Sequence, residues 1–422
     1  MIVKKLLFLA GILIQSFGIS AQSVNNYPIT PVSFTKVKIE DNFWKPRLET
    51  NRTITIPYDF QKCEETGRIQ NFEVAAGQKD GKFVGIRFND SDVFKIMEGA
   101  AYSLANHPDP QLENYLDELI EKVAEAQEDD GYLYTARTID PDNPAPRTGD
   151  VRWQFLDHSH ELYNVGHMYE AAVAHYQATG KRTFLEVAIK NANLIASTFG
   201  HDKQYGFPGH QEIEIGLVKL YRVTKDEEYL KLAKYFLDVR GTEAGERKYT
   251  QSLDPYFQSH MPVVEQTTAV GHSVRATYMY SGMADVAAIV GDKNYIDAID
   301  KIWGNVVYKK TYITGGIGAR HNGESFGNDY ELPNETAYNE TCAAIANCMW
   351  NHRMFLLKGD AKYYDVLERT LYNGFLSGIS LEGDKFFYPN PLACNAEYKF
   401  NQGALSRKPW FDCSCCPANI VR

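Results

Sequence analysis

The chain has 422 residues, of which 44% are hydrophobic and 13% aromatic, so it is long and apolar enough to bury a large core. Its formal net charge of −10 argues against nucleic acid as a partner, and no cluster of basic residues with interleaved aromatic residues occurs in the sequence. The aromatic content is typical of a thick helical core or of a groove in which flat rings stack on sugars.

The first 21 residues have the pattern of a secretory signal. Lys4 and Lys5 give a positive start, residues 6–14 are apolar, and Ser20-Ala21 offers a small-residue cleavage site. A membrane anchor needs an apolar run of about 20 residues, which this segment does not reach. The sequence therefore predicts an exported protein, periplasmic or secreted, with no membrane span. Residues 22–36 are predicted to be a lead-in to the main domain.

A repeated pattern follows the lead-in. Segments with a polar opening, an aromatic residue and helix-spaced apolar residues recur along the chain. Their aromatic residues are Tyr115, Phe184, Tyr229, Tyr295 and Tyr363 or Tyr364. Each segment is preceded by another stretch with apolar residues at steps of three and four, as in Leu162, Val165, Met168, Tyr169 and Ala172. Five helical hairpins are therefore predicted, with loops rich in Gly, Pro, Asn and Asp between them. Short extended runs are expected at residues 131–135 and 386–388.

The first helix of each hairpin begins with polar residues. The openings read Asp90-Ser91-Asp92, His158-Ser159-His160-Glu161, His210-Gln211-Glu212, His272-Ser273 and Asn339-Glu340-Thr341-Cys342, and a sixth begins at Cys415-Cys416. Helix capping explains Asp, Ser and Asn at such positions, but His and Cys are poor caps. In a ring of hairpins, the same ends of the inner helices meet at one face. The sequence therefore predicts that these residues share a pocket.

The sixth opening lies close to the last residue of the sequence. The stretch from Cys415 to Arg422 is too short for one full helix of an ordinary hairpin. We therefore expect an all-α barrel that is truncated before or within its sixth hairpin.

The seven cysteines are an odd number, and Cys394, Cys413, Cys415 and Cys416 crowd the last tenth of the chain. Disulfides are common in exported proteins, but the neighbours Cys415 and Cys416 cannot easily bridge each other. Together with Glu340 and Cys342, this pair supplies three sulfurs and one carboxylate, a ligand set that suits zinc. A disulfide from Cys342 to one of the pair, or inert buried thiols, are the alternatives.

A glycine-rich loop spans residues 314–327 and contains Glu324. It lacks the Gly-Lys-Ser/Thr ending of a phosphate-binding loop and follows no strand of a βαβ unit. Its glycines allow the backbone to fold tightly and to present Glu324 inward. The alternative is an ordinary solvated carboxylate on the surface.

Several segments of the sequence together resemble the β-L-arabinofuranosidases of glycoside hydrolase family 127 and the related family 146. They are His160-Glu161-Leu162-Tyr163, Pro208-Gly209-His210-Gln211-Glu212, Gly271-His272-Ser273-Val274-Arg275, Gly315-Gly316-Ile317-Gly318 with Glu324, Tyr330-Glu331-Leu332-Pro333-Asn334, Glu340-Thr341-Cys342-Ala343 and Cys415-Cys416-Pro417-Ala418-Asn419. The resemblance runs from Val37 to the last residue. It implies that residues 37–422 form an (α/α)6 catalytic barrel, and the β-sandwich region that follows the barrel in this family is not in the sequence.

The resemblance also implies roles for individual residues. Zn²⁺ would be held by Glu340, Cys342, Cys415 and Cys416. Cys415 would be the nucleophile and Glu324 the general acid/base, with His160, His210 and His272 as sugar contacts. Ala418 stands where many relatives carry proline, and the extra Cys413 is a possible competitor for metal or for a disulfide.

The implied activity is that of a retaining glycoside hydrolase that releases β-L-arabinofuranose from a plant polysaccharide or a glycoprotein oligosaccharide. Within the same family, a rarer pectic sugar is an alternative substrate. Other helical toroids suggest a uronyl hydrolase or a sugar epimerase, which would need no thiols. A non-catalytic glycan-binding toroid is the remaining alternative. The oligomeric state and the roles of Cys63, Cys348, Cys394 and Cys413 are open at this point.

Overall fold

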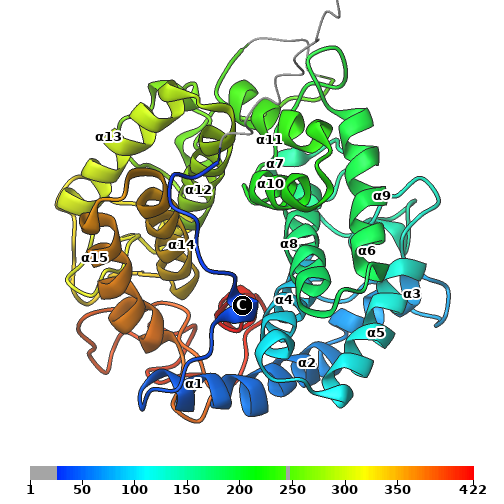
Figure 1. The fold of residues 1–422 in the computed structure, drawn as a ribbon, viewed down its shortest axis with the longest axis horizontal. Helices are drawn as coiled ribbons and strands as arrows, with labels where there is room; N and C mark the ends of the chain where they lie inside the picture. The colour runs from blue at the N-terminus through cyan, green and yellow to red at the C-terminus, as the bar shows by residue number, and fades with distance from the viewer. Residues whose placement is uncertain (1–25, 244–247) are drawn as a thin grey trace, which may run out of the picture.

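The computed structural model describes residues 26–243 and 248–422, in which helices dominate. The predicted signal segment at residues 1–21 lies outside the described residues. Within them, six helices form an inner ring (Figure 1). They are α4 (Asp90–Asn106), α8 (Glu161–Thr179), α10 (Ile213–Thr224), α12 (Ser273–Val290), α14 (Thr341–Lys358) and α16 (Cys415–Ile420). Each packs on the next, and the short α16 packs on both α14 and α4, so the ring is closed. The predicted all-α toroid is confirmed.

A second layer of helices lies outside this ring (Figure 1). Its members that complete the five predicted hairpins are α5 (Pro110–Glu125), α9 (Thr183–Thr198), α11 (Glu227–Val239), α13 (Lys293–Lys309) and α15 (Ala361–Arg369), the last continued by a π-helical segment, η6 (Thr370–Phe375). The pairing of each inner helix with the outer helix that follows it agrees with the sequence pattern.

The outer position beside α16 is filled from the beginning of the chain. Here α1 (Trp44–Thr50) and α2 (Ile56–Glu65), joined by a π-helical turn, η2 (Asn51–Thr55), lie below the end of the chain in Figure 1. Nδ2 of Asn51 donates to the backbone oxygen of Val421 across 3.2 Å, and Nε1 of Trp44 donates to the hydroxyl of Tyr372. Elements from opposite ends of the sequence therefore close the double ring. The helix α3 (Arg68–Ala75) follows and leads to α4.

The two layers differ in the distribution of their apolar residues. Every residue of α12 except Val290 is buried, as expected for a helix that is surrounded by others. In α5 only a stripe of Leu116, Leu119, Ile120 and Val123 is buried, with the period of one helix face. The outer helices are therefore amphipathic, while the inner helices form the core.

Close approach between inner helices depends on glycine. A Cβ atom on Gly216 of α10 would lie 2.6 Å from the backbone oxygen of Gly166 in α8. A Cβ atom on Gly99 of α4 would lie 2.3 Å from the backbone oxygen of Val421. Side chains at these positions would push the inner helices apart, so glycine sets the radius of the ring.

Four outer helices begin with the same capping device. The side chains of Asp109, Asp226, Asp292 and Asp360 accept hydrogen bonds from backbone N–H groups in the first turns of α5, α11, α13 and α15. An aspartate at this position satisfies otherwise unpaired donors and favours the positive end of the helix dipole. The caps therefore mark in the sequence where the chain turns back along the outside of the ring.

The segment that precedes α1 crosses one end of the ring (Figure 1). The hydroxyl of Tyr27 donates to Oδ1 of Asp285, near the C-terminal end of α12, across 2.9 Å. The ring of Phe34, in a 3₁₀ turn, η1 (Phe34–Lys36), contacts that of Tyr102 near the end of α4. Residues 27–36 thus lie against α12 and α4 at the end of the barrel where these inner helices finish.

The side chain of Arg422 contacts several inner helices. Its guanidinium contacts Glu98 of α4 and Glu170 of α8 at 2.8 and 2.6 Å. It also lies 3.9 Å from Glu212, the residue before α10, and donates to the hydroxyl of Tyr278 in α12. Its remaining contacts are with Met349 of α14 and Asn419 of α16. One side chain therefore touches the ring at six places.

The connections contain short helices and little extended pairing. The helical turns are α6 (Thr135–Thr138), α7 (Leu156–Ser159), η3 (Pro255–Phe257), η4 (Val263–Glu265), η5 (Asn322–Glu324) and η7 (Leu376–Gly378). Phe386 makes isolated bridges with Ile379 and Lys408, whereas residues 131–134 make none, and the described residues contain no regular strand.

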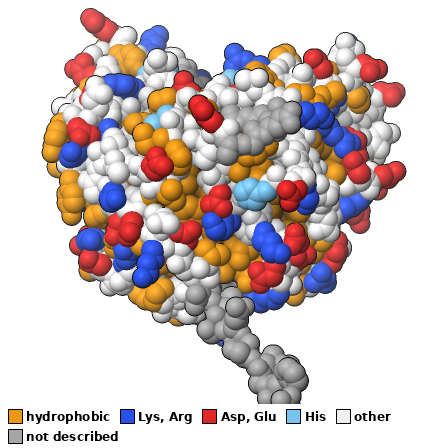
Figure 2. Space-filling view, turned by 90° about the horizontal axis from the view of Figure 1, so that it is seen from above, with side chains coloured by type: hydrophobic (Ala, Val, Ile, Leu, Met, Phe, Trp, Pro, Cys, Tyr) orange, Lys and Arg blue, Asp and Glu red, His pale blue; other side chains and the backbone are white. Residues whose placement is uncertain are grey.

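Lys/Arg and Asp/Glu side chains are mixed over the face in Figure 2, in keeping with the absence of a basic segment in the sequence. Among the described residues, no helix has both the length and the apolar character that crossing a membrane requires.

Candidate active site

A cavity of about 350 Å³ opens where the inner helices begin. Its lining includes residues from the start of each of five inner helices. In chain order, these helix starts contribute His160, His210, His272, Glu340 and Cys415. The structure therefore brings together the polar openings that the sequence placed in phase. The opening at Asp90-Ser91-Asp92 is the exception, because Arg87 and Phe88, just before α4, line the cavity in its place.

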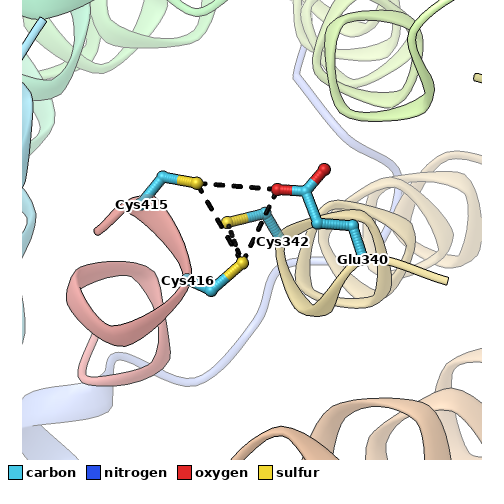
Figure 3. Close-up of side chains that lie close together, drawn as sticks. All are labelled: Glu340, Cys342, Cys415 and Cys416. Carbon is cyan, nitrogen blue, oxygen red and sulfur yellow. Dashed lines mark hydrogen bonds between the residues drawn. The ribbon is translucent and has the colours of Figure 1, made fainter. Parts of the chain in front are cut away.

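Four side chains form a compact cluster at one side of this cavity (Figure 3), which we call the thiol cluster: Glu340, Cys342, Cys415 and Cys416. Glu340 and Cys342 come from the start of α14, and the two other cysteines come from the start of α16. Sγ of Cys342 lies 3.4 Å from Sγ of Cys416. Oε1 of Glu340 lies 3.6 Å from each sulfur of the pair, and those two sulfurs are 4.0 Å apart.

These distances fit a tetrahedral metal ion. Zinc–sulfur bonds of about 2.3 Å in tetrahedral geometry place the sulfurs about 3.8 Å apart, close to the separations in the thiol cluster. Oε2 of Glu340 is buried with no hydrogen-bond partner. Burial and the charges of Glu324 and Cys415 raise the pKa of Glu340 well above its usual value, and burial raises that of Cys416. Four acidic groups crowded in this way need a cation if they are to be ionised together.

The structure does not support the disulfide alternative. All seven cysteines lie in the described residues, and all are free. Cys413 lies 3.9 Å from Cys415 and lines the cavity, but it is not a member of the four-residue cluster. Cys63 is buried, Cys348 is half-buried and Cys394 is exposed, all away from that cluster.

Glu324 lies in the glycine-rich loop, as the sequence predicted, and is turned inward by its backbone. Gly323 and Glu324 have φ values of 68° and 51°, the left-handed region in which glycine is at ease and glutamate is strained. The hydroxyl of Ser273 in α12 donates to the backbone oxygen of Glu324 across 3.0 Å. Gly318 has a φ of 89°, and a Cβ atom there would lie 2.6 Å from that hydroxyl, so the loop is held tightly against α12.

Three donors surround the carboxylate of Glu324. Nε2 of His272 lies 2.7 Å from Oε2, and the hydroxyls of Tyr338 and Tyr388 donate to Oε1 across 2.6 and 3.3 Å. Burial raises the pKa of Glu324, but the hydrogen bonds from His272 and the two tyrosines outweigh burial and lower the pKa to about 2. In the free protein, Glu324 is therefore a carboxylate at neutral pH.

The tautomer of His272 follows from its role at the start of α12. Its Nδ1 accepts the backbone N–H groups of Val274 and Arg275 across 3.2 and 3.5 Å. Because burial lowers the pKa of His272, the ring is neutral and its one proton must be on Nε2, which donates it to Glu324.

His160 and His210 have the opposite tautomer. Nδ1 of His160 lies 2.7 Å from the backbone oxygen of His158, and Nδ1 of His210 lies 2.8 Å from that of Gln211. A carbonyl oxygen only accepts, so each Nδ1 carries the proton and each Nε2 is an acceptor. Burial lowers the pKa of both rings well below the usual value. Both are neutral rings that can accept hydrogen bonds from sugar hydroxyls.

Tyr388 connects the thiol cluster to Glu324, and sequence reasoning missed it. Its hydroxyl lies 3.1 Å from Sγ of Cys415 and 3.3 Å from Oε1 of Glu324. Its backbone oxygen accepts the N–H of Thr341, which fixes the segment at the start of α14. The segment has no periodic pattern, so only its place in the fold identifies Tyr388. The same holds for Arg87 and Arg147, which also line the cavity.

A second group of acidic and histidine side chains, His167, Glu170 and Glu212, lies deeper in the ring. Nζ of Lys219 lies 2.5 Å from Oε1 of Glu170, and the Arg422 guanidinium lies 2.6 Å from Oε2. These two cations already neutralise the group, so a metal ion is not needed there. The thiol cluster is the better candidate for a metal centre.

The closed helical ring, with a thiol cluster and an inward carboxylate at one end, defines a helical toroid with a cysteine-rich site. A family model described as the β-L-arabinofuranosidase GH127 catalytic domain matches residues 36–422. The chain therefore belongs to this family.

Individual relatives agree with this assignment. A non-reducing end β-L-arabinofuranosidase of Bifidobacterium longum subsp. longum is 40% identical, over 92% of this chain and 64% of its own length. A solved GH127 β-arabinofuranosidase is 59% identical with a TM-score of 0.88, over 94% of this chain and 61% of that one. A GH127 β-L-arabinofuranosidase of Geobacillus stearothermophilus T6 is 44% identical with a TM-score of 0.85, over 91% of this chain and 64% of that one. The chain thus spans less than two thirds of the length of these relatives.

Proposed function

We propose that the protein is a retaining glycoside hydrolase that releases β-L-arabinofuranose from plant cell-wall glycans, with Cys415 as nucleophile and Glu324 as general acid/base. The observation that carries the proposal is the meeting of the thiol cluster and Glu324 in one cavity, with the hydroxyl of Tyr388 between Cys415 and Glu324. Two relatives, 40% and 59% identical to this chain, are named as a β-L-arabinofuranosidase and a β-arabinofuranosidase. These names describe those proteins, and they support the choice of arabinofuranose for this chain.

The first step forms a bond between Sγ of Cys415 and the anomeric carbon. The bond from that carbon to the leaving oxygen breaks, and its electron pair goes to this oxygen, which takes a proton from Glu324. This is the two-step retaining scheme, with sulfur in place of one of the usual carboxylates. Sugar hydroxyls donate to Nε2 of His160 and His210 and fix the ring in the cavity.

The second step regenerates the thiolate of Cys415. Glu324, now ionised, takes a proton from a water molecule whose oxygen bonds to the anomeric carbon. The carbon–sulfur bond breaks, and its electron pair returns to Cys415. Each displacement inverts the configuration of the anomeric carbon, so two in succession restore the original configuration and the product is released with retention.

The two roles of Glu324 require two protonation states. The hydrogen bonds of the free protein favour the carboxylate, which is the form that the second step needs. The first step needs the acid, so the proposal requires substrate to raise the pKa of Glu324. A sugar in the cavity removes water from the carboxylate, and this desolvation acts in the required direction.

The thiol cluster has the donor set and spacing of a zinc site, with Glu340, Cys342, Cys415 and Cys416 as ligands. Zinc bound there would hold the sulfurs as thiolates at neutral pH, including that of Cys415. The strained backbone of Glu324 and the anchored start of α14 keep the remaining groups in place around it.

Export belongs to the same proposal. We infer export from the signal pattern at residues 1–21, because plant polysaccharides and glycoprotein oligosaccharides are met outside the cytoplasm. Seven free cysteines in such a compartment are consistent with a metal that protects the thiol cluster.

The test is turnover of an aryl β-L-arabinofuranoside by the wild type, Cys415→Ser and Glu324→Gln. Each substitution is expected to lower kcat/KM by at least about 10²- to 10⁴-fold, the usual contribution of a positioned acid or base. Cys348→Ser, on the outer face of α14, is the matched control and should retain activity. Full activity in Cys415→Ser or Glu324→Gln would refute the assigned role.

A further inference from the structure

Three arginines line the cavity beside the thiol cluster and Glu324. We call Arg87, Arg147 and Arg275 the arginine cluster. Arg87 lies just before α4, Arg147 lies in the loop between α6 and α7, and Arg275 lies in the first turn of α12. Burial and the charges of Arg147 and Arg275 lower the pKa of Arg87. The ring of His158 lines the same cavity.

Arg275 is a buried cation without an acidic partner. It is 3% exposed, and its Nη1 donates to the backbone oxygen of Gly209 across 2.5 Å. Its Nε is buried with no hydrogen-bond partner. The guanidinium lies 4.9 Å and 5.2 Å from the ring centroids of Tyr256 and Phe257, which fix its plane.

Arg87 and Arg147 also lack an acidic partner. Among the described residues, none of the three arginines has a carboxylate within the 4.0 Å of an ion pair. Nε of Arg87 donates to the backbone oxygen of His158, and Arg147 is exposed with a left-handed backbone, φ 68°. The donors of these side chains are therefore available to a ligand in the cavity.

Three other buried arginines of the described residues are paired with a carboxylate. Arg68 lies 3.0 Å from Asp92, Arg240 lies 3.6 Å from Glu214, and Arg422 lies 2.6 Å from Glu170. A fourth, Arg137, donates to the backbone oxygens of Gly149 and Asp150 across 2.8 and 2.7 Å. Burying a charge without a partner is costly, and at three of these four positions the chain supplies a carboxylate from its own sequence. At the arginine cluster, the missing carboxylate is not supplied by the described part of the chain.

We propose that the arginine cluster binds the carboxylate of a uronic acid residue that neighbours the β-L-arabinofuranose, an inference that rests on the proposed function. The planar fork of a guanidinium matches a carboxylate in a bidentate manner. Arabinofuranose has no carboxylate, so the anion must belong to the adjoining part of the glycan. The protein is therefore selective for arabinofuranose attached to an acidic glycan.

The position of the cluster agrees with a neighbouring sugar. Glu324 and Glu340 line the same cavity but are not within ion-pair distance of any of the three arginines. The charge of Glu324 reaches Arg275 only at longer range, where it opposes the lowering of the pKa of Arg275 by burial, so neither carboxylate forms an ion pair with the arginine cluster. Cys415, Arg147 and the imidazole acceptors of His160 and His210 all line this cavity.

The first experiment compares binding of galacturonate and of its neutral methyl ester by calorimetry, with the full-length protein. The two ligands differ only in the charge of the carboxyl group. We expect the wild type to bind the acid at least about tenfold more tightly, the effect of one charge-assisted hydrogen bond. Equal affinity for the two ligands would overturn the proposal.

Substitutions then locate the effect. Arg87→Gln and Arg147→Gln, at half-buried and exposed positions, should each bring the ratio of affinities for acid and ester close to one. Arg182→Gln, at an exposed arginine just before the outer helix α9, is the matched control and should leave the ratio at the wild-type value. An acid preference that persists in both cavity variants would also overturn the proposal.

Turnover distinguishes failure of this inference from failure of the proposed function. Two substrates are compared, a β-L-arabinofuranosyl galacturonate and its methyl ester, and kcat/KM for the acid should be at least about tenfold higher, mainly through KM. Cleavage of both substrates at equal rates would overturn the inference and leave the proposed function standing. Acid-selective binding without cleavage of either would refute the proposed function and support the arginine cluster as an anion site.

Discussion

Nε2 of His272 lies 2.7 Å from Oε2 of Glu324, and the same imidazole caps α12 through its Nδ1. One ring therefore connects the start of an inner helix to the carboxylate that we propose as acid/base. Because backbone N–H groups occupy Nδ1, the proton is held on the side of the ring that faces Glu324. The start of α12 thus fixes the position of Glu324 and favours its carboxylate form.

Glu324 should contribute to stability in a pH-dependent manner. Its folded-state pKa is about 2, below the ordinary value of 4.5, so its stabilising effect is fully present above pH 4.5 and is lost as the pH falls toward 2. Glu324→Gln should therefore lower the free energy of unfolding most at neutral pH and progressively less at acidic pH. Urea unfolding of both proteins between pH 3 and 7 measures this, and a difference that does not change with pH would contradict it.

The thiol cluster should hold one zinc ion per chain. Cys342→Ser and Cys416→Ser each remove one of four ligands and should lose most of the metal found in the purified wild type, because zinc needs the full tetrahedral set. Cys413→Ser is the matched control, since Cys413 lies 3.9 Å from Cys415 but outside the cluster. Metal analysis of the purified proteins gives the stoichiometry. Equal metal content in Cys342→Ser and Cys413→Ser would show that the ligand set is different.

The hydroxyl of Tyr388 should position the nucleophile relative to Glu324. Tyr388→Phe keeps the ring and removes hydrogen bonds to both groups, so kcat should fall about 10- to 100-fold, as expected for bonds to charged partners. The melting temperature should change little. Tyr115→Phe, which loses a hydroxyl that bonds to Glu64 on the outer layer, is the control. An unchanged kcat in Tyr388→Phe would exclude a positioning role.

Arg422 should stabilise the closed ring. Arg422→Met keeps much of the side-chain volume but leaves Glu98 and Glu170 with only Lys219 as a cation, and we expect a loss of about 3 kcal/mol in unfolding free energy. Arg182→Met breaks an exposed pair with Glu186 and should cost less than about 1 kcal/mol. Urea unfolding at pH 7 compares the two. Similar losses in both variants would mean that the six contacts of Arg422 do not hold the ring.

Much of the architecture was predictable because it depends on local signals. Apolar residues at helical spacing, such as Leu116, Leu119 and Ile120, predict an outer helix wherever they occur. The phase of the polar openings predicted that His160, His210 and His272 would meet. This prediction needed only the assumption of a ring, since equivalent ends of repeated hairpins lie at one face.

The closure of the ring was harder to predict from the sequence. Cys415 begins a helix of a single turn and a half, and the outer layer beside it comes from α1 and α2 at the other end of the chain. Such a pairing has no local signature, because it depends on contacts between residues as far apart as Asn51 and Val421. The expectation of a truncated sixth hairpin stays a prediction.

By itself, the sequence determined the helical repeat, the ligand types of the thiol cluster and the carboxylate of Glu324, because each depends on residue type and short-range order. Only the tertiary structure decided that Tyr388 bridges two of these groups and that Arg87, Arg147 and Arg275 share a wall of the same cavity. Tyr388, Arg87 and Arg147 lie in irregular segments, and Arg275 lies in the first turn of α12. In the irregular segments, side-chain direction is set by packing against distant helices rather than by periodicity. Tyr388 and Glu324 are 64 positions apart in the sequence, and no local pattern predicts that the hydroxyl of Tyr388 lies 3.3 Å from Oε1 of Glu324.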